Sequence, residues 1–281
     1  MTTAEPPWQR CDARRLKRIA GGVSADVFLL PPDRVLKLLL PGLGPAMAGR
    51  EFDAARIAHA AALPVPDALA LAQDGERHGI VFERLSEAPL ARRLRRMPGP
   101  VMLTLANMAR LQARAHAVVA PAGALPTAHA LLGARCVDAM TPAAARLAAQ
   151  RQLAQLPEGD RLLHGDLHLG NVITARSQLM AVDWAQAMIG DPAADVARTE
   201  LLMRFGRYGP ALRRHPALRI ARHAAADWYL FCYRRLTGMT RERIDAWRLP
   251  TAVAWMRSDS AAHLPSLRRY VERRLARDQS R

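Results

Sequence analysis

The interpretation of this chain depends on one stretch, LLHGDLHLGNVI, which occupies residues 162–173. The apolar pairs at its two ends predict short buried strands, and the glycine-containing segment 164–171 between them predicts a loop. Within that loop Asp166 stands five residues before Asn171, and a second aspartate, Asp183, ends the next apolar run. The sequence therefore brings two carboxylates and one amide to the ends of neighbouring strands.

This spacing matches the catalytic loop of kinases, in which a base and two metal ligands surround a transferred phosphoryl group. The reaction needs a carboxylate that accepts the proton of the attacking hydroxyl, and hard oxygen ligands that hold Mg²⁺ against the phosphates. We assign Asp166 as the catalytic base, and Asn171 and Asp183 as the Mg²⁺ ligands. A metal site at His164 and His168 is disfavoured, because the glycines beside them interrupt the helix that such a pair requires.

On these residues the chain resembles the aminoglycoside phosphotransferase and choline kinase-like family, which has a protein-kinase-like fold. Leu169 departs from the family pattern, which often has proline there, but the change removes no chemical group. The resemblance implies that His164 and Asp195 support the catalytic loop, and that Asp195 bonds the loop backbone rather than the substrate. The family motifs His-Gly-Asp-x-His-x-x-Asn, Val-Asp-Trp and Gly-Asp-Pro-x-x-Asp fall here at residues 164–171, 182–184 and 190–195.

The first third of the chain predicts the site of the donor phosphates. Lys37 lies inside the apolar segment 35–39 and is one of only two lysines among 41 Lys and Arg residues. A lysine retained at such a position favours a compact ammonium that binds phosphate. A buried ammonium needs a counter-charge, and Glu51, which opens a predicted helix over 51–62, is the expected partner. Asp53 is the alternative partner, but it points about 200° away around the helix.

Two further segments are expected to contact the nucleotide. A turn at Gly21, Gly22 and Ser24 lies between apolar runs, and such a turn can place backbone N–H groups over phosphates. Residues 79–85 predict a strand that runs into a connector. In the resembling family this connector pairs with the base of ATP or GTP, which implies that Glu83 and Leu85 line the base.

The element pattern predicts an α+β, two-lobed protein-kinase-like fold. Residues 1–83 are expected to form a small β-rich N-lobe with one helix, and residues 84–281 a larger, mainly helical C-lobe. Trp255 and Asp259 are expected to face the acceptor cleft, and His116 is expected to be an ordinary surface or capping residue. Helices of the C-lobe are predicted over residues 88–97, 101–120, 218–236 and 241 to the end.

Composition narrows the functional class. The chain has 281 residues, which is long enough for a two-lobed domain, and no apolar run of membrane-spanning length. Its three cysteines, Cys11, Cys136 and Cys232, show no paired spacing, which disfavours zinc and disulfides and favours the cytoplasm. The high content of alanine, leucine and arginine is typical of a GC-rich bacterial genome.

The formal net charge of +16 lies entirely in the predicted C-lobe. Residues 1–83 hold 10 basic and 10 acidic side chains, whereas residues 84–281 hold 31 basic and 15 acidic ones. A basic lobe repels polycations, so we expect a small hydroxyl acceptor that is not polycationic. A purely compositional origin of the charge, from an arginine-rich genome, is the alternative.

The leading hypothesis is a small-molecule kinase that uses Mg²⁺ with ATP or GTP and phosphorylates a sugar, amino alcohol, antibiotic or related metabolite. One alternative is a catalytically degenerate kinase-like protein that binds nucleotide and contacts nucleic acid or an anionic membrane through its basic C-lobe. A protein kinase is the weaker alternative, because the loop reads His-Gly-Asp rather than His-Arg-Asp and no Ala-Pro-Glu follows Asp183.

Overall fold

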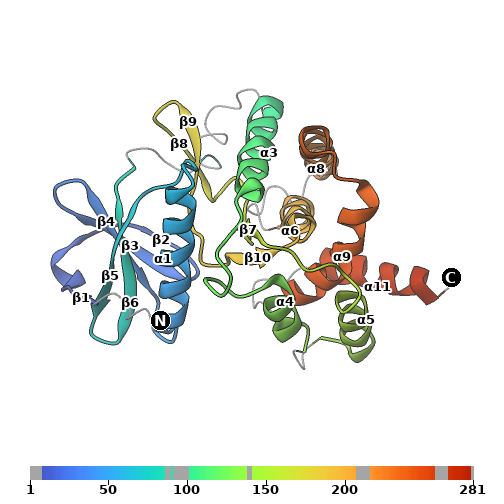
Figure 1. Ribbon diagram of the computed structural model, residues 1–281, viewed down its shortest axis with the longest axis horizontal. Coiled ribbons are helices and arrows are strands. Elements are labelled where there is room, and N and C mark those ends of the chain that lie inside the picture. The colour runs from blue at the N-terminus through green and yellow to red at the C-terminus, as the bar shows by residue number, and fades with distance from the viewer. Residues whose placement is uncertain are drawn as a thin grey trace.

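A computed structural model describes residues 8–85, 90, 101–137, 141–206, 216–256 and 265–279. A six-stranded sheet lies at one end of the molecule and the helices after residue 100 lie at the other, with one helix between them (Figure 1). This is the α+β, kinase-like architecture that the sequence predicted.

The sheet places Lys37 on one of its central strands. The strand order is β1-β5-β6-β4-β3-β2, and every pair is antiparallel except β1 with β5. On β4, Lys37 lies opposite Val27 of β3 and Ile80 of β6, so both neighbouring strands fix its backbone. The strands are β1 (Gln9–Arg10), β2 (Lys17–Gly21), β3 (Ala25–Leu30), β4 (Arg34–Leu39), β5 (Ala68–Asp74) and β6 (Arg77–Glu83), with a short 3₁₀ turn at Ala13–Arg15.

Helix α1 (Pro45–Ala60) covers one face of this sheet. It begins six residues before the predicted start at Glu51, because Pro45 at the first turn is already set for a helix. Its buried side chains recur at helical spacing, and Phe52 belongs to one buried cluster with Leu71 and Ile80 of the sheet. Glu51 is thereby carried on the face of the helix that meets the sheet.

Short strands and helices make up the rest of the chain. The predicted helices over 101–120 and 218–236 are present as α3 and α8, and the helical region predicted from 241 onwards contains α9 and α11. The predicted helix over 88–97 and Asp259 lie outside the described residues, apart from Leu90. The helices are α3 (Val101–Ala117), α4 (Ala128–Cys136), α5 (Ala143–Leu153), α6 (Pro192–Phe205), α8 (Pro216–Thr237), α9 (Arg241–Met256) and α11 (Pro265–Gln279).

Two short pairs of antiparallel strands position the catalytic segment. The strand β7 (Arg161–Leu163) pairs with β10 (Met188–Gly190), and β8 (Val172–Ala175) pairs with β9 (Gln178–Ala181). The predicted loop 164–171 thus connects β7 to β8.

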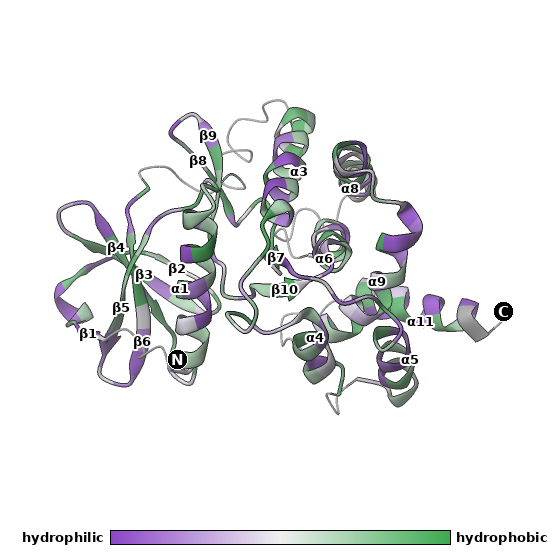
Figure 2. Cartoon of the chain, viewed as in Figure 1, coloured by the Kyte–Doolittle hydropathy of each residue, from purple (hydrophilic) through white to green (hydrophobic). Residues whose placement is uncertain are grey.

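The main hydrophobic core surrounds α6, whose residues are buried on almost every side. Figure 2 shows hydrophobic residues along the inner strands and helices, with hydrophilic residues at the outer ends of the strands. Ala54, Ala58, Leu63 and Val65 also belong to this core, so α1 and the segment after it pack against the helical part. The division of the chain into lobes at residue 83 stays a prediction.

The three cysteines are free thiols in the structure. None of the helices in the described part of the chain is long and apolar enough to cross a membrane.

Candidate active site

The loop that carries Asp166 requires a glycine at position 165. Gly165 has φ of +77°, in the left-handed region where a side chain is strained. A Cβ atom there would also lie 2.1 Å from the carbonyl oxygen of Gln186. The chain can therefore turn sharply between β7 and Asp166 only because this residue has no side chain.

Asp195 holds the start of the loop through its backbone. The fully buried carboxylate accepts hydrogen bonds from the backbone N–H groups of His164, at 3.0 Å, and Gly165, at 2.8 Å. It also accepts bonds from the side chains of Gln112, at 2.9 Å, and His116, at 3.0 Å. Burial alone would raise the pKa of Asp195, but the bonded His116, the charge of nearby histidines and Gln112 lower it to about 2.

The expectation that His116 is a surface or capping residue is wrong. Its ring is buried between the carboxylate of Asp195 and the hydroxyl of Tyr233, which lies 2.6 Å from Nδ1. The hydroxyl of Tyr229 in turn donates a short hydrogen bond to Gln112. Helices α3 and α8 therefore contribute to the position of the catalytic loop through Asp195.

His164 links the loop to the segment that carries Asp183. Its Nε2–H donates to the carbonyl oxygen of Val182 at 3.1 Å, and its Nδ1 accepts from the backbone N–H of Asp166 at 3.3 Å. One neutral tautomer satisfies both bonds. The ring also packs 4.5 Å from that of Trp184. His164 thus contacts both the catalytic loop and the segment that carries Asp183.

Asp166 presents a partly exposed carboxylate in a fixed orientation. The amide Nδ2 of Asn171 donates to the backbone oxygen of Asp166 at 2.9 Å, which closes the loop. The guanidinium of Arg198 contacts one carboxylate oxygen of Asp166 at 3.0 Å, and His168 lies 3.7 Å from the other. The carboxylate is about a quarter exposed, so a substrate hydroxyl can reach it.

Lys37, Glu51 and Asp183 meet in one ion-pair cluster. The ammonium of Lys37 lies 2.6 and 2.8 Å from the two carboxylate oxygens of Glu51, and 2.7 Å from Asp183. Burial would lower the pKa of Lys37, but the two carboxylates outweigh burial and raise it above its ordinary value. Burial would raise the pKa of Asp183, but the charge and hydrogen bond of Lys37, together with nearby His164 and His168, outweigh burial and lower it below its ordinary value.

Asp183 combines an unusual backbone conformation with an accessible side chain. Its φ is +65°, in the left-handed region that aspartate tolerates better than most residues. The side chain is 36% exposed, whereas that of Glu51 is 1% exposed. Glu51 is therefore the buried counter-ion, and Asp183 is the carboxylate that a ligand can reach.

The donor atoms left at this site fit Mg²⁺. One oxygen of Asp183 and the amide oxygen of Asn171 accept no hydrogen bond from the described residues. Within the described residues no group of three or more His, Cys, Asp or Glu side chains is arranged to hold a metal ion. Mg²⁺ typically takes only one or two protein oxygens and completes its shell with water and substrate phosphates, so this sparse set suits it.

The two segments predicted to contact the nucleotide are described at residues 21–24 and up to residue 85. The β2–β3 hairpin closes through a hydrogen bond of 2.9 Å from the Gly22 N–H to the Ala25 oxygen. At the connector, the N–H groups of Glu83 and Arg84 already donate to backbone oxygens, and the Glu83 carboxylate pairs with Arg176 at 2.9 Å. Among the described residues, Leu85 is the first of the connector with an uncommitted N–H.

Comparison with known proteins identifies the family. A model of the phosphotransferase enzyme family matches residues 15–238. The chain belongs to this family. No curated protein matches the sequence significantly.

Solved structures share the fold of this phosphotransferase. A choline/ethanolamine kinase family protein from Mesorhizobium loti superposes with a TM-score of 0.58 at 19% identity, over 94% of this chain and 87% of that one. An aminoglycoside phosphotransferase of Streptomyces rimosus, solved with ADP and streptomycin, gives 0.55 at 18% identity, over 82% and 90%. The GDP and kanamycin complex of an APH(2'')-type enzyme gives 0.57 at 13% identity, over 95% and 93%.

Sequence reasoning missed Arg198 of this phosphotransferase. Besides contacting Asp166, its guanidinium lies 4.5 Å above the ring of Trp255, which holds it by a cation–π contact. Helical spacing could have indicated that Arg198 lies near the catalytic loop, because it follows Asp195 by three residues and shares its side of α6. Trp255, which was expected to face the acceptor cleft, is brought to Asp166 through this arginine.

Proposed function

We propose that this phosphotransferase transfers the γ-phosphoryl group of ATP or GTP to a hydroxyl group of a small acceptor. The observation that carries the proposal is the contact of Lys37 with Glu51 and Asp183, beside a loop that presents Asp166. Kinase-type transfer needs this combination of a phosphate-binding ammonium, metal-binding oxygens and a carboxylate base. ADP and GDP are named in the solved complexes with the same fold, which supports a purine nucleotide as donor.

In this proposal Asp166 orients the acceptor hydroxyl and takes its proton as the oxygen attacks phosphorus. Asn171 holds the loop closed beneath Asp166, and Arg198 contacts Oδ1 of its carboxylate. Oδ2 has only longer contacts, 3.4 Å from the Asn171 amide and 3.7 Å from His168, and we assign it to the hydroxyl. Restricting the carboxylate in this way reduces the entropy lost when the acceptor is aligned.

Asn171 and Asp183 would hold Mg²⁺, which when bound neutralises charge on the donor phosphates. Lys37 supplies a second positive charge from β4, and Glu51 keeps its ammonium aimed toward Asp183. We assign the donor phosphates to residues 1–83, with Gly21, Gly22 and Ser24 above them and Leu85 beside the base. The acceptor is assigned to residues 84–281.

The acceptor we propose is not polycationic, for example a sugar, an amino alcohol with a single positive charge, or a related metabolite. The guanidinium of Arg198 lies at the base itself, and a polycationic substrate would meet it directly. Trp255 offers an apolar ring beside the same point. A nucleoside triphosphate donor places the reaction in the cytoplasm.

A protein kinase is the less suitable reading of this site. Strand β10 begins at Met188, five residues after Asp183, which leaves no length for an activation segment there. The donor and base residues of the proposal are all in place, which disfavours a degenerate fold that only binds nucleotide.

The test is turnover with a panel of hydroxyl compounds, measured as release of ADP or GDP, for the wild type and Asp166→Asn. We expect Asp166→Asn to lower kcat by about 10²- to 10⁴-fold, the usual contribution of a general base, with unchanged nucleotide affinity. Asp160→Asn, at a mostly exposed aspartate near the same strand, is the matched control and should keep full activity. Full activity of Asp166→Asn would remove Asp166 from its role.

A further inference from the structure

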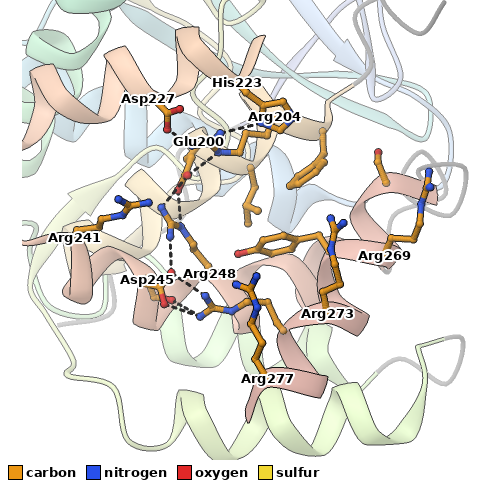
Figure 3. Close-up of a pocket in the computed structure, with 15 residues that line it drawn as sticks. Glu200, Arg204, His223, Asp227, Arg241, Asp245, Arg248, Arg269, Arg273 and Arg277 are labelled. Carbon is orange, nitrogen blue, oxygen red and sulfur yellow. Dashed lines mark hydrogen bonds and ion pairs between the residues drawn. The ribbon is translucent and has the colours of Figure 1, made fainter. Parts of the chain in front are cut away.

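A cavity lies between helices α6, α8, α9 and α11, and it does not include the residues assigned to phosphoryl transfer (Figure 3). Its volume is about 740 Å³, and small-molecule sites typically span about 300–1,000 Å³. None of its lining residues is Lys37, Glu51, Asp166, Asp183 or Arg198. The cavity has room for a metabolite-sized ligand that the proposed reaction does not use.

The lining of this cavity is strongly basic. Seven arginines and three carboxylates line it, and they come from four helices that lie apart along the chain. Buried or clustered like charges repel one another, so an excess of this size needs either solvent or an anion to balance it. The distribution of the three carboxylates decides which arginines are already balanced.

Three inner arginines use all three carboxylates. Glu200 is buried and receives hydrogen bonds from Arg204, at 2.8 Å, and Arg248, at 2.7 and 2.9 Å. Arg248 also contacts Asp245 at 2.5 Å, and a further inner arginine, Arg274, contacts Asp245 at 2.8 Å. Asp227 pairs with Arg204 at 2.5 Å. This network forms the floor of the cavity, and it pairs every carboxylate of the lining.

Four outer arginines surround that floor, and within the described residues none of them has a carboxylate partner. Arg241 begins α9, and Arg269, Arg273 and Arg277 recur every four residues along α11, so these three share one helical face. Figure 3 shows Arg241 on one side of the ion-pair network and Arg273 and Arg277 on the other.

A stripe of like charges four residues apart destabilises a helix in isolation. Here the three arginines are exposed at the rim of the cavity, which they line together with Tyr270 of the same helix. The ring centroid of Tyr270 lies 5.3 Å from that of Phe205, and the ring centroid of His223 lies 6.3 Å from that of Phe205. The cavity therefore pairs an aromatic wall with a ring of unbalanced guanidinium groups.

We propose that this cavity binds a small organic anion that carries phosphate, with Arg241, Arg273 and Arg277 as its principal ligands. The planar guanidinium fork matches phosphate oxygens in two-point contacts, which is why arginine is favoured over lysine for this purpose. The organic part of the ligand lies against Phe205 and Tyr270. A concave site of this size suits a small phosphate ester, whereas a nucleic acid needs an extended basic surface.

The test is isothermal titration of the full-length protein with inorganic pyrophosphate in the absence of Mg²⁺. Wild type is compared with Arg273→Gln/Arg277→Gln and with the control pair Arg235→Gln/Arg268→Gln, which removes the same charge from exposed arginines outside the cavity. Lys37→Ala serves as the variant that removes binding at the donor site. Circular dichroism confirms that each variant is folded.

We expect one pyrophosphate per chain, and affinity at least about tenfold weaker in Arg273→Gln/Arg277→Gln. Lys37→Ala and the control pair should keep wild-type affinity. Equal weakening in the control pair would show general electrostatic attraction, and loss only in Lys37→Ala would show binding at the donor site. Either result, or no binding to wild type at millimolar pyrophosphate, would overturn the proposal.

Sedimentation with phosphatidylglycerol vesicles separates a free phosphate ester from a lipid head group. The proposal predicts that the protein stays in the supernatant at physiological salt. Sedimentation that Arg273→Gln/Arg277→Gln abolishes and that pyrophosphate does not compete away would assign the cavity to a membrane surface instead.

Discussion

Replacing Asp195 with asparagine tests how the catalytic loop is held. The carboxylate accepts four hydrogen bonds, two from the loop backbone and two from Gln112 and His116. Three of these reach Oδ2, so the best orientation of an asparagine keeps its oxygen there and turns its NH₂ toward the N–H of Gly165. Two donors then face each other in a fully buried site, and the negative charge is lost.

The expected loss of stability follows from two independent figures. The pKa of Asp195 is lowered from 3.8 to about 2, which corresponds to about 2 kcal/mol of favourable interaction with the ionised form. A buried hydrogen bond to a charged group contributes about 1.5–3 kcal/mol, and the unpaired Gly165 N–H adds a desolvation penalty of about 1–3 kcal/mol. Because these terms overlap, we expect a destabilisation of about 2–4 kcal/mol.

Urea unfolding at neutral pH measures this value, with Asp160→Asn as a matched control at an exposed aspartate. The control should change the free energy of unfolding by less than about 0.5 kcal/mol. The folded Asp195→Asn protein should also show lower kcat, because the loop backbone that positions Asp166 is no longer anchored. A change below about 0.5 kcal/mol together with normal kcat would refute the anchoring role.

Three further predictions address the charges around the site. Because Asp195 has a lowered pKa in the folded protein, its stabilising contribution should be complete above about pH 4 and be lost as the pH falls to about 2; acid unfolding in which Asp195→Asn keeps this dependence would contradict the assignment. Glu51→Gln removes the buried counter-ion of Lys37 and should raise the nucleotide KM by about tenfold or more; an unchanged KM would mean that Lys37 does not need Glu51. Arg198→Gln should raise the acceptor KM and lower kcat, with the nucleotide KM unchanged, and a rise in the nucleotide KM alone would place Arg198 on the donor side.

The sequence predicts most about the candidate site where its residues lie in a short local pattern. Asp166, Asn171 and Asp183 fall within 18 consecutive residues, and the strands between them have clear apolar boundaries. Lys37 stood out because lysine is so rare in this chain, and the contact with Glu51 across 14 residues follows from helix geometry on the sheet. The kinase-like fold followed from the same motifs.

Contacts between distant helices could not be predicted in the same way. The bond from His116 to Asp195 joins residues 79 apart, and nothing in the pattern around His116 distinguishes it from a surface histidine. Arg198 and Trp255 meet only because α6 packs against α9. The basic cavity likewise depends on α11 lying beside α6 and α9, which no local motif encodes.

The earlier start of helix α1 has a simpler cause. The alanine-rich stretch that predicts this helix begins at Glu51. Pro45 at the first turn already fixes the backbone angle that a helix needs, so the helix begins there. The six additional residues extend α1 along the sheet, and Ala48 and Phe52 are buried there.

The central claim is that Lys37, Asn171 and Asp183 form a working site for a Mg²⁺-bound nucleotide. Thermal unfolding of the wild type and Asp183→Asn, with and without Mg²⁺-ATP or Mg²⁺-GTP, tests it directly. A nucleotide at a hundredfold excess over its dissociation constant stabilises the folded state by about 2.7 kcal/mol. We expect a magnesium-dependent rise of the unfolding temperature with at least one nucleotide, and we expect Asp183→Asn to lose it. No rise with either nucleotide, or an equal rise in Asp183→Asn, would contradict it.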